Sequence, residues 1–157
     1  MSDRLPALPP AGRPEQRFTD LIVDFTGTLS RDGVLLPGVA ERLRSLAQNL
    51  RITVLTADTF GTAVAQLDGL PVKVRIVETG AEKAEVVRAT AAKGVIAIGN
   101  GRNDAPLLQL AELAIAVVGP EGAAAELLRV ADVVVRDIAD ALDLILHPLR
   151  LKATLRE

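Results

Sequence analysis

Six short apolar runs, each five or six residues long and rich in Val and Ile, constrain the fold more than any other feature of the sequence. Most of them are apolar without strict alternation, which is typical of strands that are buried on both faces of a parallel sheet. The runs lie at 20–25, 51–56, 72–77, 94–99, 113–118 and 131–135.

Segments with the spacing of helices separate these runs. Val39, Leu43, Leu46 and Leu50 recur at i, i+4, i+7 and i+11, and a similar pattern over 138–146 follows Asp137, a suitable N-cap. Alternating strands and helices predict a three-layer α/β fold with a mostly parallel central sheet.

The length of 157 residues suits one domain. Residues 1–17 carry four of the nine prolines, so we expect a flexible Pro-rich arm there, or a segment that docks on a neighbouring subunit. We expect the catalytic domain at 18–147 and a C-terminal tail at 148–157.

Composition excludes several classes of protein. Aromatic residues make up 2% of the chain, which argues against single-stranded nucleic-acid binding because that binding uses aromatic side chains for stacking. The chain has no cysteine, which fits the cytoplasm and rules out disulfides, and no apolar run approaches the ~20 residues of a membrane span. We expect no nucleic-acid partner and no membrane.

Asp32-Gly33 is a tight-turn signal between short apolar pieces in the segment 27–38. A small β-hairpin is therefore predicted beside Asp24, where it would act as a flap over a site.

Polar groups follow three of the predicted strands, at Asp24, at Thr56-Ala57-Asp58 and at 99–104. Ligands of open parallel sheets bind beyond the carboxyl ends of the strands, so these groups converge on one edge. Asp24 is either a carboxylate that caps a turn or a nucleophile that attacks phosphorus to form an aspartyl-phosphate.

A nucleophilic carboxylate needs a divalent cation and donors for the phosphoryl oxygens. Gly27 and Thr28 could supply backbone N–H groups, and Thr56 a hydroxyl. Asn100, Asn103 and Asp104 form an oxygen-rich cluster that suits Mg²⁺. Lys83 is the candidate cation, or a solvated charge on a helix face beside Glu82 and Glu85.

Four motifs occur in the order "DFTGT", "LTAD", "EKAEVV" and "GNGRND". With them the chain resembles the haloacid dehalogenase (HAD) superfamily of aspartyl-phosphate-forming hydrolases. It resembles the phosphorylation domain of P-type ATPases more closely, because "DFTGTLS", "TADTFGTA", "KAEVV" and "GNGRNDAPLL" match the ATPase motifs in order. The resemblance covers about residues 21–135.

The resemblance implies a HAD-like Rossmannoid fold, a Mg²⁺ cofactor and roles for individual residues. Asp24, Thr26, Thr56 and Lys83 would be catalytic, with Asp24 as the nucleophile. Phosphate would contact a set of loop residues and one lysine: Gly27, Thr28, Thr56, Ala57, Lys83 and Asn103. Mg²⁺ would meet Asp24, the Thr26 carbonyl, Asn100 and Asp104.

Two residues depart from the pattern of the phosphatases in this superfamily. Thr26 stands where they carry a second Asp that shuttles protons, so we expect slow turnover or a long-lived phospho-enzyme. Asn100 replaces the first Asp of the last motif and brings no charge, so metal affinity should fall.

Parts of larger relatives are also missing from the sequence. Only 31 residues separate Asp24 from Thr56, and 26 separate Thr56 from Lys83. This spacing leaves no room for a nucleotide-binding domain or a cap domain, and we expect a homo-oligomer to supply the missing cap through the flap at 30–36 and the C-terminal 147–157.

We therefore expect a Mg²⁺-dependent phosphohydrolase that acts on a small phosphate monoester. The alternative is a catalytically weak regulatory or protein-interaction module that keeps the fold. Asp58 is interpreted as ordering its loop and His147 as structural, whereas Arg102 either touches phosphate or faces solvent.

Overall fold

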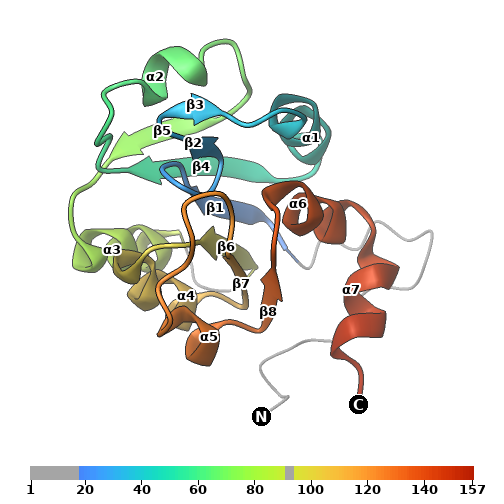
Figure 1. Ribbon diagram of the computed structural model, residues 1–157. Coiled ribbons are helices and arrows are strands. Elements are labelled where there is room, and N and C mark those ends of the chain that lie inside the picture. Colours follow the sequence, from blue (N-terminus) through green and yellow to red (C-terminus); the bar gives the residue numbers. More distant parts are fainter. Residues whose placement is uncertain (1–17, 91–93) are drawn as a thin grey trace.

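The structure, a computed structural model, describes residues 18–90 and 94–157, so the predicted arm at 1–17 lies outside the described residues. Its centre is a six-stranded sheet in the order β5-β4-β1-β6-β7-β8, and every neighbouring pair is parallel (Figure 1). The strands are β1 (Asp20–Asp24), β4 (Arg51–Thr56), β5 (Lys73–Ile76), β6 (Val95–Gly99), β7 (Leu113–Val117) and β8 (Val133–Val135). All six predicted strands and the parallel sheet are confirmed.

Burial along the strands follows their place in the sheet. Every residue of β1, β6 and β7 is buried, because helices cover both faces of these inner strands. The edge strand β5 is mostly exposed, and its charged residues Lys73 and Arg75 face solvent. Such charges on an edge oppose pairing with other chains.

Helices form the two outer layers (Figure 1). One face of the sheet packs against α1 (Val39–Leu46), α2 (Ala63–Gln66), α6 (Ile138–Leu146) and α7 (Pro148–Leu155). The other face packs against α3 (Gly80–Ala89), α4 (Ala105–Leu110) and α5 (Leu127–Val130). The predicted three-layer fold is confirmed, and the described residues between Asp24 and Lys83 contain no inserted domain.

The predicted helix signals have visible causes. Val39, Leu43 and Leu46 are buried on one side of α1, and Leu50 is buried after that helix has ended. The Asp137 side chain accepts a hydrogen bond of 2.7 Å from the Ala139 N–H, as an N-cap does.

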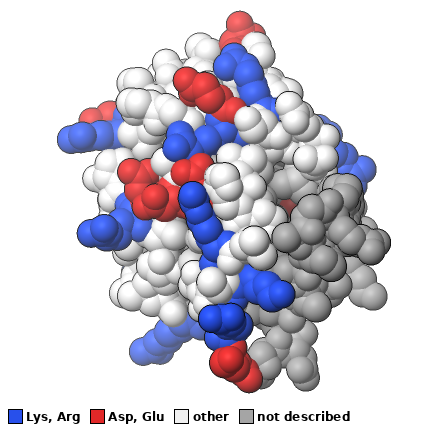
Figure 2. Space-filling view, turned by 90° about the vertical axis from the view of Figure 1, so that its right-hand side faces the viewer, with Lys and Arg blue, Asp and Glu red and all other residues white. Residues whose placement is uncertain are grey.

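Residues 148–157, predicted as a tail, include helix α7, and its Leu151 is buried in the core. Proline at the first helical position starts this helix, since its missing N–H has no helical partner there. Figure 2 views the side of the molecule that carries α1, α6 and α7, where positive and negative side chains both appear. None of the helices described is long and apolar enough to cross a lipid bilayer.

The predicted hairpin is confirmed as β2 (Ser30–Arg31) paired with β3 (Val34–Leu35). Its two turn residues, Asp32 and Gly33, have φ values of 52° and 78°. Positive φ at both positions is the mark of a type I′ turn, whose twist matches that of the strands it joins.

Candidate active site

Three strand ends and one helix bring the predicted site residues together. Asp24 ends β1, Thr56 ends β4, and the 3₁₀ helix η2 (Arg102–Asp104) follows β6. Lys83 approaches from the first turns of α3. These groups meet at the carboxyl edge of the sheet.

Lys83 forms the centre of the site. Its Nζ lies 2.9 Å from Asp24 Oδ1 and 2.7 Å from Asp104 Oδ1, and it donates a longer bond of 3.3 Å to Asn103 Oδ1. Lys83, Asp24 and Asp104 are all buried, at 1%, 5% and 0% exposure. The interpretation of Lys83 as a solvated charge on a helix face is therefore wrong.

Helix α3 begins early enough to aim Lys83 inward. The Thr79 side chain accepts from the Glu82 N–H, and the Glu82 carboxylate accepts from the Thr79 N–H, a capping box that fixes the first turn. A Cβ on Gly80 would lie 2.9 Å from the Asn103 carbonyl oxygen, so glycine lets the helix approach the loop after β6.

Two carboxylates share one ammonium, which leaves an excess of negative charge. Burial, and then the charge of Asp104, raise the pKa of Asp24 from 3.8 to about 7 against the opposing effect of Lys83. Burial alone would lower the pKa of Lys83, but the charges of Asp24 and Asp104 outweigh it and raise that pKa. The site would therefore gain from an added positive charge.

Thr28 links the nucleophile candidate to the last motif. Its Oγ1 lies 3.2 Å from Asp24 Oδ2 and 3.1 Å from Asn100 Oδ1. A hydroxyl has one proton to donate, so it can satisfy only one of these two oxygens at a time. The other oxygen is available to a ligand.

Thr56 is buried, and its Oγ1 accepts a 2.8 Å bond from the Asp58 N–H. The Thr26 hydroxyl lies 3.4 Å from it, a long contact. Asp58 takes a φ of 57° and its side chain accepts from the Ala63 N–H, which agrees with its interpretation as a residue that orders the loop. Ala57 is exposed beside this pair.

Asp104 also holds its own loop in shape. Its Oδ2 accepts from the N–H groups of Asn100 and Gly101, at 3.1 and 3.0 Å. A Cβ on Gly99 would lie 2.5 Å from this carboxyl group. Arg102 faces solvent and pairs with Glu126 at 2.8 Å, which favours the solvent-facing alternative for that residue.

A fourth loop, after β7, joins the site and was not predicted. The Asn100 Nδ2 donates 3.0 Å to the Gly122 carbonyl, and a Cβ on Gly119 would lie 2.9 Å from the Gly27 carbonyl. The only local signal is the turn composition of "GPEG" (119–122), which carries no hint of its partner.

The oxygen donors suit a hard divalent cation, although no three His, Cys, Asp or Glu side chains cluster as a metal site in the part of the chain that the structure describes. Asp24 and Asp104 carry charge, and the shared hydroxyl of Thr28 keeps Asn100 Oδ1 beside Asp24 Oδ2. The raised pKa of Asp24 is a second sign that a cation would be accommodated.

The flap is fastened on both sides. The Asp32 N–H donates 2.8 Å to Glu121 Oε2, and the Gly33 carbonyl accepts from the Thr62 hydroxyl. On β3, the second strand of the flap, the Leu35 N–H donates a hydrogen bond of 2.8 Å to Gln66 Oε1. These bonds join the flap to the loops after β4 and β7 and to helix α2.

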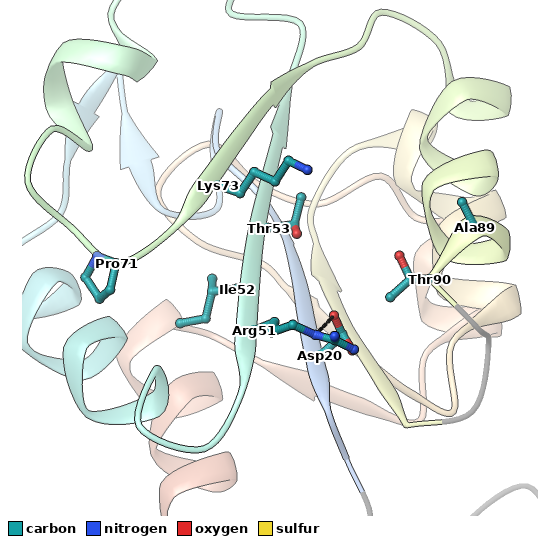
Figure 3. A pocket seen from close by; sticks show the side chains of 8 residues that line it. All are labelled: Asp20, Arg51, Ile52, Thr53, Pro71, Lys73, Ala89 and Thr90. Carbon is teal, nitrogen blue, oxygen red and sulfur yellow. Dashed lines mark hydrogen bonds and ion pairs between the residues drawn. The ribbon is translucent and has the colours of Figure 1, made fainter.

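A cavity of about 560 Å³ lies at the opposite, amino end of the strands, between β4, β5 and the end of α3 (Figure 3). Arg51 pairs there with Asp20 at 2.8 Å, and Lys73 extends over Thr53. None of the predicted site residues lines this cavity.

Similarity to known proteins is found both in sequence and in fold. No family model matches the chain. It is 55% identical over 65 residues to uncharacterized protein MJ0073 of Methanocaldococcus jannaschii, a match that spans 41% of this chain and 70% of that protein.

Solved structures share the fold. 3-Deoxy-D-manno-octulosonate 8-phosphate phosphatase from Moraxella catarrhalis, in complex with magnesium and phosphate ions and 3-deoxy-D-manno-octulosonate (KDO), superposes with a TM-score of 0.70 at 17% identity, over 85% of this chain and 88% of that one. A protein from Streptomyces avermitilis assigned to the HAD hydrolase family gives 0.63 at 21% identity, over 82% and 84%.

The catalytic domain of the CPx-ATPase CopB gives a TM-score of 0.60 at 25% identity, over 71% of this chain and 46% of that one. Phosphatases and an ATPase domain therefore share one arrangement of strands and helices with this protein. The chain belongs to the same family as MJ0073, and its fold is that of the HAD hydrolases.

Proposed function

We propose that this protein is a phosphohydrolase that works through an aspartyl-phosphate on Asp24, with Mg²⁺ as cofactor and a small phosphate monoester as substrate. The observation that carries the proposal is the buried Asp24–Lys83–Asp104 group, with distances of 2.9 and 2.7 Å. Burying two carboxylates around one lysine costs stability, and such groups concentrate at functional sites.

In the first step, an Asp24 carboxylate oxygen attacks phosphorus, and the bond to the ester oxygen breaks. The leaving alkoxide takes a proton from solvent, because Thr26 offers no acidic group. In the second step, water attacks the same phosphorus, and inorganic phosphate leaves as the Asp24 carboxylate is restored.

Neighbouring groups would stabilise the phosphoryl oxygens during both steps. Lys83 supplies a positive charge, Thr28 supplies a hydroxyl from the loop after β1, and Thr56 supplies one from the end of β4. The Thr56 oxygen accepts from the Asp58 N–H and has only a long contact of 3.4 Å with the Thr26 hydroxyl, so its proton would be able to turn toward a phosphoryl group. The loop N–H groups at 27–28 and Ala57, and the Asn103 amide, are further candidates for phosphate binding.

Asp24, Asp104, the Asn100 amide oxygen and the Thr26 carbonyl would hold the cation. When bound, it would offset the negative charge of phosphate and carboxylates. The magnesium and phosphate ions in the structurally similar Moraxella phosphatase support this assignment. A cytoplasmic location, and a homo-oligomer that closes the site, remain predictions from the sequence.

The experiment is a phosphatase assay with Mg²⁺ over a panel of monoesters, run on wild type, Asp24→Asn and Thr26→Asp. Asp24→Asn should abolish turnover, since its amide is no nucleophile. Thr26→Asp should preserve or raise turnover, because a positioned general acid–base contributes roughly 10²–10⁴-fold.

Equal background rates for wild type and Asp24→Asn across the panel would refute the enzymatic proposal. That result would favour the alternative, a regulatory or protein-interaction module. Phosphate trapped covalently on wild type but absent from Asp24→Asn would support the aspartyl-phosphate directly.

A further inference from the structure

We propose that the site selects phosphate esters whose leaving group carries no negative charge and presents an apolar surface. This inference rests on the proposed function and adds the class of substrate to it. Two independent features of the loops around the site carry it: their net charge, and the exposed side chain of Phe60.

Charged side chains on these loops and at the start of the helices that follow them, here called the rim, are mostly acidic. Six carboxylates and two guanidinium groups give the rim a net charge of −4, whereas the whole chain carries −2. The acids are exposed or half-buried. The rim consists of Arg31, Asp32, Asp58, Glu78, Glu82, Arg102, Glu121 and Glu126.

Contacts with site residues show that the rim borders the site. The Asp58 N–H binds the Thr56 hydroxyl, and Gly80, between Glu78 and Glu82, packs on Asn103. The Gly122 carbonyl, next to Glu121, accepts from the Asn100 amide. Each of these segments follows the carboxyl end of a strand.

The two cations of the rim do little to attract an anionic leaving group. Arg102 Nε is paired with Glu126 Oε1 at 2.8 Å. Arg31 stands on the flap, next to Asp32. The buried Lys83 is held by Asp24 and Asp104, and in the proposed reaction it faces the phosphoryl group. A carboxylate or second phosphate on the leaving group would therefore meet repulsion from the rim.

Phe60 adds an apolar contact at the same place. It follows Thr56 by four residues and is one of only three phenylalanines in the chain. Its side chain is nevertheless 46% exposed. A Cβ on Gly33, at the tip of the flap, would lie 2.6 Å from Phe60 Cβ. Val34 beside that glycine is 57% exposed, so the flap and the loop after β4 offer an apolar surface together.

The test compares kcat/KM for three phosphate esters. Phenyl phosphate has a neutral, apolar leaving group, phosphocholine a cationic one and phosphoglycolate an anionic one. At low salt we expect phosphoglycolate to have the lowest kcat/KM, by roughly 10-fold. The negative electrostatic potential of the rim would lower the local concentration of an anionic substrate by about this factor. Adding NaCl to about 0.5 M should reduce this difference in kcat/KM between the substrates, because salt screens exposed charges.

A pair of variants locates the effect. Glu78→Lys reverses one rim charge and should raise kcat/KM for phosphoglycolate several-fold while lowering it for phosphocholine. Asp68→Lys makes the same change of charge on an exposed residue in the turn that leads to the amino end of β5. This control should leave kcat/KM unchanged for both phosphoglycolate and phosphocholine.

The outcomes separate the two proposals. Turnover that needs Asp24 but prefers phosphoglycolate, or a preference that salt and Glu78→Lys leave unchanged, would overturn the inference and leave the phosphohydrolase standing. Turnover of none of the three esters, with Asp24→Asn equal to wild type, would overturn both.

Discussion

Replacing the candidate nucleophile should stabilise the protein. The pKa of Asp24 is about 7 in the folded state and 3.8 in its ordinary state, because the folded protein buries this carboxyl beside Asp104. Between these two values the folded chain holds a proton that the unfolded chain has released. The free energy of unfolding therefore falls as pH rises from about 4 to 7, and the loss is complete above pH 7.

The magnitude follows from the size of this shift. A rise in the pKa of Asp24 from 3.8 to about 7 corresponds to about 4 kcal/mol of free energy of unfolding. Asparagine resembles the protonated carboxyl and never acquires the charge. Asp24→Asn should therefore be more stable than wild type by up to about 4 kcal/mol at pH 8, or roughly 10 °C in Tm, and about equal to it near pH 4.

Urea unfolding followed by circular dichroism, between pH 4 and pH 8.5 in EDTA, measures this difference. EDTA is needed because a bound cation would offset the charge of Asp24. Asp68→Asn is the matched control: Asp68 is exposed, and the change should stay within about 0.5 kcal/mol at every pH. An Asp24→Asn protein that is no more stable than wild type at pH 8 would refute the electrostatic reasoning.

Two further predictions concern the loops of the site. Gly27→Ala should lower the free energy of unfolding in urea by several kcal/mol, because its φ is +77° and the new Cβ would lie 2.5 Å from Asn100 Nδ2. The control Gly69→Ala has a similar φ of +79° but open space around the new Cβ, so it should lose only about 1–2 kcal/mol. Equal losses in the two variants would contradict the packing argument. Asn100→Asp should bind Mg²⁺ or Mn²⁺ roughly tenfold more tightly in titration calorimetry, because it adds a carboxylate beside Asp24, and an unchanged affinity would show that Asn100 lies outside the cation site.

The strands and the convergence of polar groups could be predicted because both leave local patterns. Runs of Val and Ile mark buried strands, and polar residues at the ends of parallel strands must share an edge. This pattern alone predicts that Asp24, Thr56 and Asp104 lie close together. The tight turn at Asp32-Gly33 was equally local, since two positive φ values demand particular residues.

Other features depend on packing between distant segments. The approach of Gly119 to Gly27, and the bond from Asn100 to Gly122, join loops that share no sequence pattern. The sequence indicates Lys83 as the candidate cation but leaves a solvated charge as the alternative, because only the tertiary fold surrounds it with two carboxylates. Residues 148–157 are predicted as a tail, whereas in the structure Pro148 is the first residue of helix α7 and Leu151 packs into the core.

The pairing of β1 has a consequence for how the chain is made. Asp20 lies beside Arg51 on one side and Val95 on the other, 31 and 75 residues further along the sequence. During synthesis, this apolar strand would gain its first neighbour early and its second only after β6 has emerged. Until then one edge of β1 would lack its strand partner, so the nascent chain would stay prone to aggregation until β6 has been translated.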